Sequence, residues 1–198
     1  MLKIAMIAGE ASGDMLASSL ITALQKQYAG DIEFVGIGGR MMSEAGFQSW
    51  HEMETLSVMG YIEVIKSLPQ LLKLRYQILD ELIEYRPDIF IGVDAPDFTF
   101  FIENKLKQAG IKTVHYISPT IWAWRYERIY KIKKSTDLML CIFPFEEAIY
   151  AKENMAAKFI GHPMANDIEL EIDTPYYRNQ LGDRKSTRLN SSHANVSR

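Results

Sequence analysis

Residues 3–14 read KIAMIAGEASGD, in which an apolar run, Lys3–Ala8, passes directly into a glycine-bounded loop. The run is continuously apolar rather than alternating, which is typical of a strand covered on both faces. Residues 16–24 then place leucines at helical spacing, so a helix is expected to begin near Asp14. A strand that turns directly into a helix predicts the opening unit of a Rossmann-like domain.

The same alternation of strands and helices continues along the chain. One helix is expected to end at Arg86-Pro87 and another to run from Phe98 to Gln108. The fold class predicted is therefore α/β, a Rossmann-like parallel sheet with helices on both faces. Five further runs are expected to form its strands: Ile32–Ile37, Asp88–Val93, Lys112–Ile117, Asp137–Phe143 and Lys158–Ile160.

Composition limits the class of protein. The chain has 198 residues, 47% of them hydrophobic, enough for a sizeable core in one domain. It contains no apolar run of about 18 residues, and the N-terminus does not resemble a signal peptide. Cys141 lies in a strand-like run, so we expect a buried thiol in a reducing cytoplasm. Residues 184–198 hold four of the 22 basic residues and no acid, leaving 18 basic against 25 acidic residues in 1–183. That balance argues against nucleic-acid binding.

Residues 56–76, LSVMGYIEVIKSLPQLLKLRY, interrupt the alternation. We expect Pro69 to divide this segment into two short helices. They either pack on the domain or form an amphipathic surface that meets lipid, with Lys66, Lys73 and Arg75 beside the apolar residues. The candidate lipid-facing or membrane-facing residues are Met59, Ile62, Val64, Ile65, Leu68, Leu71 and Leu72.

The loop GEASGD (9–14) lies where open α/β sheets bind ligands. It lacks both the Gly-x-Gly-x-x-Gly spacing and the P-loop lysine, so nucleotide binding is only weakly indicated. The carboxylate of Glu10 would compete with a phosphate for backbone N–H donors. This favours a hydroxyl-bearing, sugar-like ligand at Gly9, Glu10, Ser12 and Gly13. Asp14 either caps the following helix or contacts the ligand.

The stretch IGVDAPDFT (91–99) ends the third predicted strand with two acids. Asp94 should emerge at the ligand edge of the sheet, where a buried carboxylate is costly unless it is paired or used. A general base that accepts a proton from a hydroxyl nucleophile is a fitting role. Asp97 could cap the following helix or bind substrate. The glycines of GIGGR (36–40) are explained by a tight turn between strand and helix.

The segment HYISPTIWAWRYERIYKIKK (115–134) mixes aromatic and basic residues. It is either a solvated basic helix with core aromatics or a surface for sugar faces and phosphate, with Trp122 and Arg125 as candidates. His162 follows the last predicted strand, where a lone histidine is typically structural. No His or Cys pair has metal-ligand spacing and no Gly-x-Ser-x-Gly elbow is present, so neither a metal nor a hydrolase nucleophile is predicted.

Seven motifs in this order resemble the lipid-A-disaccharide synthase family, inverting glycosyltransferases with two Rossmann-like domains (the GT-B fold). The resemblance covers roughly residues 3–168, and it extends only to the family's N-terminal half. One departure is Thr99, which stands where the family usually has Asn. The motifs are AGEASGD (8–14), GIGGRMM (36–42), MGYIEV (59–64), VDAPDF (93–98), SPTIWAWR (118–125), PFEEAIY (144–150) and GHP (161–163).

The resemblance implies transfer of diacylglucosamine from its UDP conjugate to diacylglucosamine 1-phosphate in lipid A biosynthesis. It implies Asp94 as the base for the acceptor's 6-hydroxyl, and no bound metal or cofactor. It also implies a cytoplasmic enzyme peripherally associated with the inner membrane. Residues implied to bind substrate are Gly9, Glu10, Ser12, Gly13, Asp97, Ser118, Trp122, Arg125 and His162.

The resemblance also implies a division of the chain. Residues 1–168 would form the acceptor-side Rossmann-like domain, and 169–183 would begin the segment leading to a second half. That UDP-binding half is missing, so the 198-residue chain is expected to be inactive. Residues 184–198 look like a disordered, non-native tail. Two alternatives stay open: another GT-B enzyme, such as a UDP-N-acetylglucosamine transferase or epimerase, and a non-catalytic sugar- or lipid-binding module.

Overall fold

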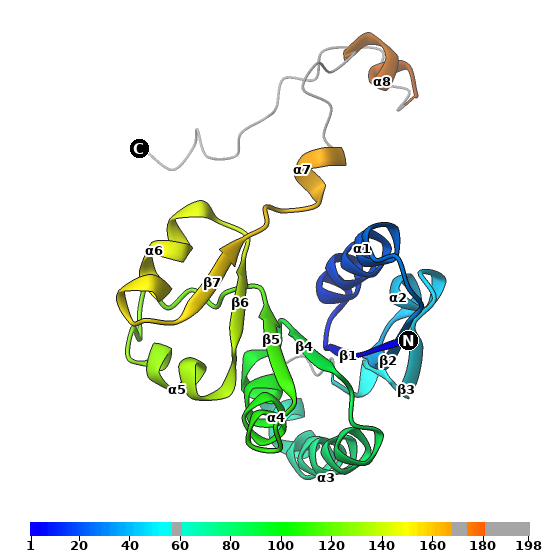
Figure 1. Ribbon diagram of the computed structural model, residues 1–198. Helices are drawn as coiled ribbons and strands as arrows, with labels where there is room; N and C mark the ends of the chain where they lie inside the picture. Colours follow the sequence, from blue (N-terminus) through cyan, green and yellow to red (C-terminus); the bar gives the residue numbers. More distant parts are fainter. Residues whose placement is uncertain (57–60, 168–173, 181–198) are drawn as a thin grey trace. The chain divides into compact units, whose positions relative to one another are not determined.

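The computed structural model describes residues 1–56, 61–167 and 174–180 (Figure 1). Met1–Pro163 form one compact unit, and a second unit begins at Met164. The strands are β1 (Leu2–Ala8), β2 (Ile32–Gly38), β3 (Gln48–Glu52), β4 (Ile89–Val93), β5 (Lys112–Tyr116), β6 (Leu138–Cys141) and β7 (Ala156–Phe159). The helices are α1 (Ala11–Gln27), α2 (Arg40–Glu44), α3 (Tyr61–Tyr85), α4 (Pro96–Gln108), α5 (Arg128–Ser135), α6 (Pro144–Lys152), α7 (Met164–Asp167) and α8 (Thr174–Gln180), and a 3₁₀ turn covers Met53–Thr55.

The seven strands form one parallel sheet in the order β3-β2-β1-β4-β5-β6-β7. The strand order reverses between β1 and β4, because the chain first builds outward through β2 and β3 and then returns to the other side of β1. Ligands of open α/β sheets bind at the carboxyl ends of the strands beside such a switch point. The loops that follow β1 and β4 therefore mark the expected site.

Helices cover both faces of the sheet (Figure 1). Within β1, Ile4 and Met6 pack with α1 on one face, while Ala5 and Ile7 pack with α3 and α4 on the other. This alternation follows from the two-residue repeat of a strand, and burial on both faces explains why the sequence is continuously apolar. A third cluster joins α5 and α6 to β6 and includes the buried Cys141. Burial raises the pKa of that thiol to about 12.

The predicted parallel α/β fold is confirmed, and all six predicted strands lie within two residues of the observed bounds at each end. The strand expected at Lys158–Ile160 is β7, which begins two residues earlier and ends one residue earlier. Strand β3 is not predicted from the sequence, because its residues QSWHE carry no apolar run. This strand lies at the sheet edge and is mostly exposed, so little burial selects apolar residues there.

The prediction that Pro69 divides its segment into two helices is wrong. Residues Tyr61–Tyr85 form the single helix α3, with Pro69 inside it. Proline removes one backbone hydrogen bond and strains the preceding turn. The helix nevertheless continues because Leu74, Ile78 and Leu82 are buried against the sheet, and this packing outweighs local propensity. Among the described residues, no helix combines the length and apolar character needed to cross a bilayer.

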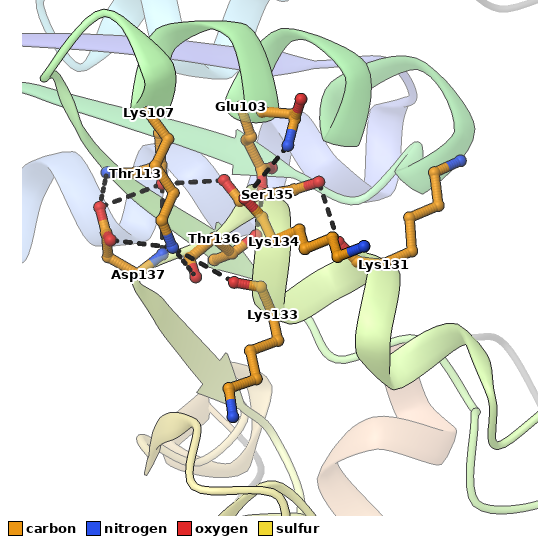
Figure 2. Close-up of polar contacts among 10 residues, drawn as sticks. Glu103, Lys107, Thr113, Lys131, Lys133, Lys134, Ser135, Thr136 and Asp137 are labelled. Carbon is orange, nitrogen blue, oxygen red and sulfur yellow. Dashed lines mark hydrogen bonds and ion pairs between the residues drawn. The ribbon is translucent and has the colours of Figure 1, made fainter.

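A polar network joins α4, α5 and the amino ends of β5 and β6 (Figure 2). The Thr113 hydroxyl donates to the Ser135 carbonyl oxygen at 3.0 Å, and Lys107 Nζ lies 3.0 Å from Asp137 Oδ1. Although burial opposes ionisation of Asp137, hydrogen bonds from Thr113 and Lys107 lower the pKa of its carboxyl group. Because this network lies at the amino ends of the strands, it is on the edge of the sheet opposite the expected ligand site.

Candidate active site

Asp94 and Ala95 form the complete link between β4 and α4. Both residues are left-handed, with φ of 53° for Asp94 and 45° for Ala95. This conformation costs roughly 1–2 kcal/mol per residue for amino acids other than glycine. Such strain persists only where the surroundings enforce it, and it gathers at functional sites. The prediction that Asp94 lies at the carboxyl edge of the sheet is confirmed.

Several hydrogen bonds hold this strained turn. The Asp94 N–H donates to the Tyr116 carbonyl oxygen at 3.0 Å, extending the pairing of β4 with β5. The buried Thr99 hydroxyl lies 3.2 Å from the carbonyl oxygens of both Asp94 and Ala95. The Asp94 carboxylate itself is half-buried and has no hydrogen-bond or ion-pair partner within the part of the chain that is described. It is therefore available to a ligand.

Asp97 does not cap α4, contrary to the capping prediction. The N-cap position belongs to Ala95, which offers no side-chain acceptor. Asp97 instead accepts a hydrogen bond of 2.9 Å from the Arg128 guanidinium, which ties α4 to α5. Because the Asp97 side chain is highly exposed, it could exchange this partner for a ligand.

The loop after β1 packs against the Asp94 turn. A Cβ atom added to Gly9 would lie 3.1 Å from the Ala95 side chain, and one added to Gly13 would lie 3.6 Å from Val93. A side chain at Gly9 would therefore be crowded, whereas a Cβ at Gly13 would make an ordinary van der Waals contact, and both positions lie close beside β4. Glu10 and Ser12 lie between the two glycines and are exposed. The structure therefore brings four predicted substrate residues next to the Asp94 turn, and their roles in binding stay predictions.

Asp14 does not cap its own helix. Helix α1 begins at Ala11, so Asp14 lies inside its first turn and is only 4% exposed. Its carboxylate accepts backbone N–H bonds from Gly39 at 2.9 Å, Met41 at 2.9 Å and Met42 at 3.1 Å. These donors are the free N–H groups at the start of α2, where an anion would otherwise bind. Asp14 therefore fills that position and fixes the glycine-rich turn after β2 to α1.

An open pocket of about 360 Å³ lies at the carboxyl ends of β2 and β3. It is lined by residues 38–40 and 49–54. Glu52 and Glu54 contribute carboxylates to this lining, which disfavours a bare phosphate there. The pocket lies on the same edge of the sheet as Asp94, on the side of β1 away from β4.

The segment after β5 carries three predicted site residues, of which one is buried and two are exposed. The Ser118 hydroxyl is buried 2.9 Å from the Tyr150 hydroxyl, so it is already used in packing α6. Trp122 is 48% exposed and packs edge-on against Phe145 with ring centroids 5.3 Å apart. The exposed Arg125 guanidinium lies 4.4 Å above the Trp124 ring. Trp122 and Arg125 are thus accessible to a ligand, and Ser118 is not.

The other predicted site residues lie apart from Asp94. His162 is half-buried after β7, which is three strands from β4 in the sheet order. On α3, Leu68 and Leu72 are 49% and 37% exposed, whereas Leu71 is half-buried. Met59 and the side chains of Ile62, Val64 and Ile65 fall outside the described residues. No group of three His, Cys, Asp or Glu side chains within the described ranges is arranged to hold a metal ion.

The backbone contribution to this site is not predicted from the sequence. Besides Asp94 and Ala95, Ile117 at the end of β5 has a φ of 85°, a strained value for a β-branched residue. Three left-handed, non-glycine residues therefore follow two adjacent strands. In the sequence Thr99 is only a departure from the family motif, whereas in the structure its hydroxyl contacts this strained backbone directly.

Residues 4–191 match the family model described as lipid-A-disaccharide synthetase. The chain belongs to this family. It is 51% identical over 181 residues to the lipid-A-disaccharide synthase of Pseudomonas aeruginosa (strain LESB58), covering 91% of this chain and 48% of that protein. It is 49% identical over 201 residues to that of Xanthomonas campestris pv. campestris (strain 8004), covering 99% and 46%. The chain thus spans about half the length of these curated relatives.

Solved structures share the fold. An S. aureus MnaA–UDP co-structure superposes with a TM-score of 0.63 at 14% identity, covering 93% of this chain and 52% of the other. A UDP-GlcNAc 2-epimerase from Neisseria meningitidis, bound to UDP-GlcNAc, superposes with a TM-score of 0.61 at 12% identity, covering 92% and 53%. At these identities the likeness concerns the fold alone. The chain has the N-terminal Rossmann-like domain of the GT-B fold.

Proposed function

We propose that the complete protein transfers 2,3-diacylglucosamine from UDP to 2,3-diacylglucosamine 1-phosphate, forming the lipid A disaccharide 1-phosphate and UDP. The observation that carries this proposal is the identity of about half of all residues to lipid-A-disaccharide synthases over nearly the whole chain. The half-buried carboxylate of Asp94 at the switch-point edge, which has no partner among the described residues, supports it, because glycosyl transfer to a hydroxyl group needs a base there.

In the proposed reaction, Asp94 accepts the proton of the acceptor's 6-hydroxyl group. The freed electron pair of that oxygen forms a bond to the anomeric carbon of the donor. The bond between this carbon and the UDP oxygen breaks, and UDP leaves with the bonding electrons. Attack from the face opposite UDP inverts the anomeric centre. The loop of residues 9–13 would line the acceptor sugar beside Asp94, with Trp122 and Arg125 as further contacts.

We further propose that UDP is bound by a second half that follows these residues. Among the residues described, the N–H groups at the start of α2 are already bonded to the Asp14 carboxylate, and the loop after β1 presents the carboxylate of Glu10. Both features disfavour a diphosphate on this half. Residues 1–168 would then hold the acceptor, and 169–183 would lead toward the UDP-binding half.

An assay of the complete protein tests this proposal. UDP release should require both acylated substrates, and the 198-residue chain alone should give no turnover. Conversion of UDP-N-acetylglucosamine to its 2-epimer, with no acceptor present, would instead identify an epimerase related to the N. meningitidis structure. Equal use of an acceptor without acyl chains would contradict the lipid substrate. Absence of any turnover would favour a binding module.

We also propose that α3 meets the inner-membrane surface or the substrate's acyl chains. Leu68 and Leu72 are four residues apart, so their exposed side chains lie on one face of the helix. A helix that follows a strand in such a sheet begins at the carboxyl edge, so these leucines lie toward the edge that carries Asp94. Tyr76 extends the same exposed face by one more turn.

Co-sedimentation with anionic phospholipid vesicles measures this association. Replacing both Leu68 and Leu72 by Ser should weaken binding at least about tenfold, because each leucine contributes roughly 1–2 kcal/mol when its exposed area is buried in lipid. Ile83→Ser is the matched control, since Ile83 is 44% exposed near the other end of α3. An equal loss in the control, or no loss in the double variant, would refute a lipid surface at this end of the helix.

A further inference from the structure

We propose that Thr99 is a positioning residue that holds the Asp94 carboxylate in its reactive direction. The proposal rests on the proposed function, in which Asp94 is the base. It assigns to Thr99 an action through the backbone rather than through contact with substrate. Thr99 is fully buried in the first turn of α4, so its side chain has no access to a ligand.

The geometry of the turn makes the hydroxyl group of Thr99 important. A left-handed residue turns its backbone away from the extended path of the strand, so the direction of the Asp94 side chain depends on keeping φ near 53°. The peptide group between Asp94 and Ala95 must stay fixed for both residues to remain left-handed. The Thr99 hydroxyl lies 3.2 Å from the carbonyl oxygen of that peptide, five residues earlier in the chain.

Other contacts restrain the two ends of the turn. The Asp94 N–H is bound to Tyr116, and the Ala95 carbonyl oxygen accepts N–H bonds from Phe98 at 2.9 Å and from Thr99 at 3.0 Å. The Thr99 hydroxyl lies 3.2 Å from the carbonyl oxygens of both Asp94 and Ala95, so its one hydrogen is shared between the two peptide groups of the turn. Without it, the peptide between Asp94 and Ala95 can rotate toward a less strained conformation, and the carboxylate moves with it.

Packing alone would not select a hydroxyl group at this position. Thr99 packs closely against Gly92, because a Cβ atom added to this glycine would lie 2.9 Å from the Thr99 Cβ. Valine has the same shape as threonine and would fill this space equally well. Serine would keep the hydroxyl but lose the methyl group. The pair Thr99→Val and Thr99→Ser therefore separates hydrogen bonding from packing.

The test uses the complete protein and measures kcat and KM for disaccharide formation. Thr99→Val should lower kcat at least about tenfold while leaving KM within about threefold, because the sugar still binds beside a misdirected base. Thr99→Ser should keep kcat within about threefold of the wild type. In an Asp94→Asn background, Thr99→Val should change the residual rate less than twofold, because the group that it positions is gone.

Thr113→Val is the matched control. Thr113 is also fully buried and its hydroxyl also donates to a backbone carbonyl oxygen, but it lies at the amino end of β5 (Figure 2). It should lower the urea midpoint of unfolding without changing kcat more than about twofold. Equal kcat losses for the two valine variants would overturn the positioning role, as would an undiminished loss in the Asp94→Asn background. If Asp94→Asn itself kept full activity, the proposed base would fail instead.

Discussion

Replacing Asp94 by Asn in the complete protein is expected to lower kcat for disaccharide formation by about 10²–10⁴-fold, the usual contribution of a general base. Asparagine has the same shape as aspartate but cannot accept a proton at the oxygen that faces the hydroxyl nucleophile. It also tolerates the left-handed conformation well, so the φ of 53° should be retained. The variant therefore removes the base while keeping the strained turn, whereas alanine would change both.

The matched control is Asp88→Asn at the other end of the same strand. Asp88 precedes β4, is exposed, and accepts a hydrogen bond of 2.8 Å from the Lys3 N–H. An amide oxygen can still accept that bond, so kcat should stay within about twofold. Thermal unfolding of both variants should match the wild type, because the Asp94 carboxylate bonds to nothing within the described residues. A kcat for Asp94→Asn within threefold of the wild type would remove Asp94 from the base role.

The sheet could be predicted because burial selects residues directly. Strands β1 and β4 are covered on both faces, so their sequences are continuously apolar and their ends are sharp. The edge strand β3 could not be predicted, because only its middle residues, Trp50 and His51, are partly buried. The single helix α3 could not be predicted for the opposite reason, since the strong local signal of Pro69 is overridden by the packing of this helix.

The position of Asp94 also followed from the sequence, but its conformation did not. A strand end beside a switch point can be located from apolar runs and topology. Pro96 disfavours the right-handed helical region for Ala95, but this does not by itself select the left-handed one. The left-handed pair depends on Tyr116 and on Thr99, and therefore on tertiary contacts.

The hydrogen-bond partners of Asp14 likewise depend on tertiary contacts that local capping rules do not include. Capping rules concern the helix next to the acid in sequence, and they indicated the start of α1. The observed donors, at the start of α2, lie 25 to 28 residues further along the chain. A Cβ on Gly39 would lie 2.6 Å from the Asp14 carboxylate, so this glycine allows the close approach. Only the folded arrangement of α1 against α2 brings these residues together.

Replacing Gly36 by Ala is expected to destabilise the fold by more than about 4 kcal/mol, a loss comparable to the entire stability of many domains. Gly36 lies in β2 directly opposite Met6 of the neighbouring strand β1. Its φ is 133°, which side chains rarely adopt, and an added Cβ would lie 2.1 Å from the Met6 carbonyl oxygen. That oxygen belongs to the backbone of a central strand, so it cannot move aside without breaking the ladder.

The variant Gly110→Ala separates the two causes of the lost stability, which are the positive φ and the clash of the added Cβ with a neighbouring atom. Gly110 also has a positive φ, 84°, but no atom lies within 4 Å of its added Cβ. The control should therefore show only the conformational cost, roughly 1 kcal/mol. Urea unfolding of the 198-residue chain, followed by circular dichroism, gives both values, and the Gly36 variant should be largely unfolded even without denaturant. Equal losses of unfolding free energy in the two variants would contradict this prediction. They would show that β1 and β2 can separate enough to admit a methyl group.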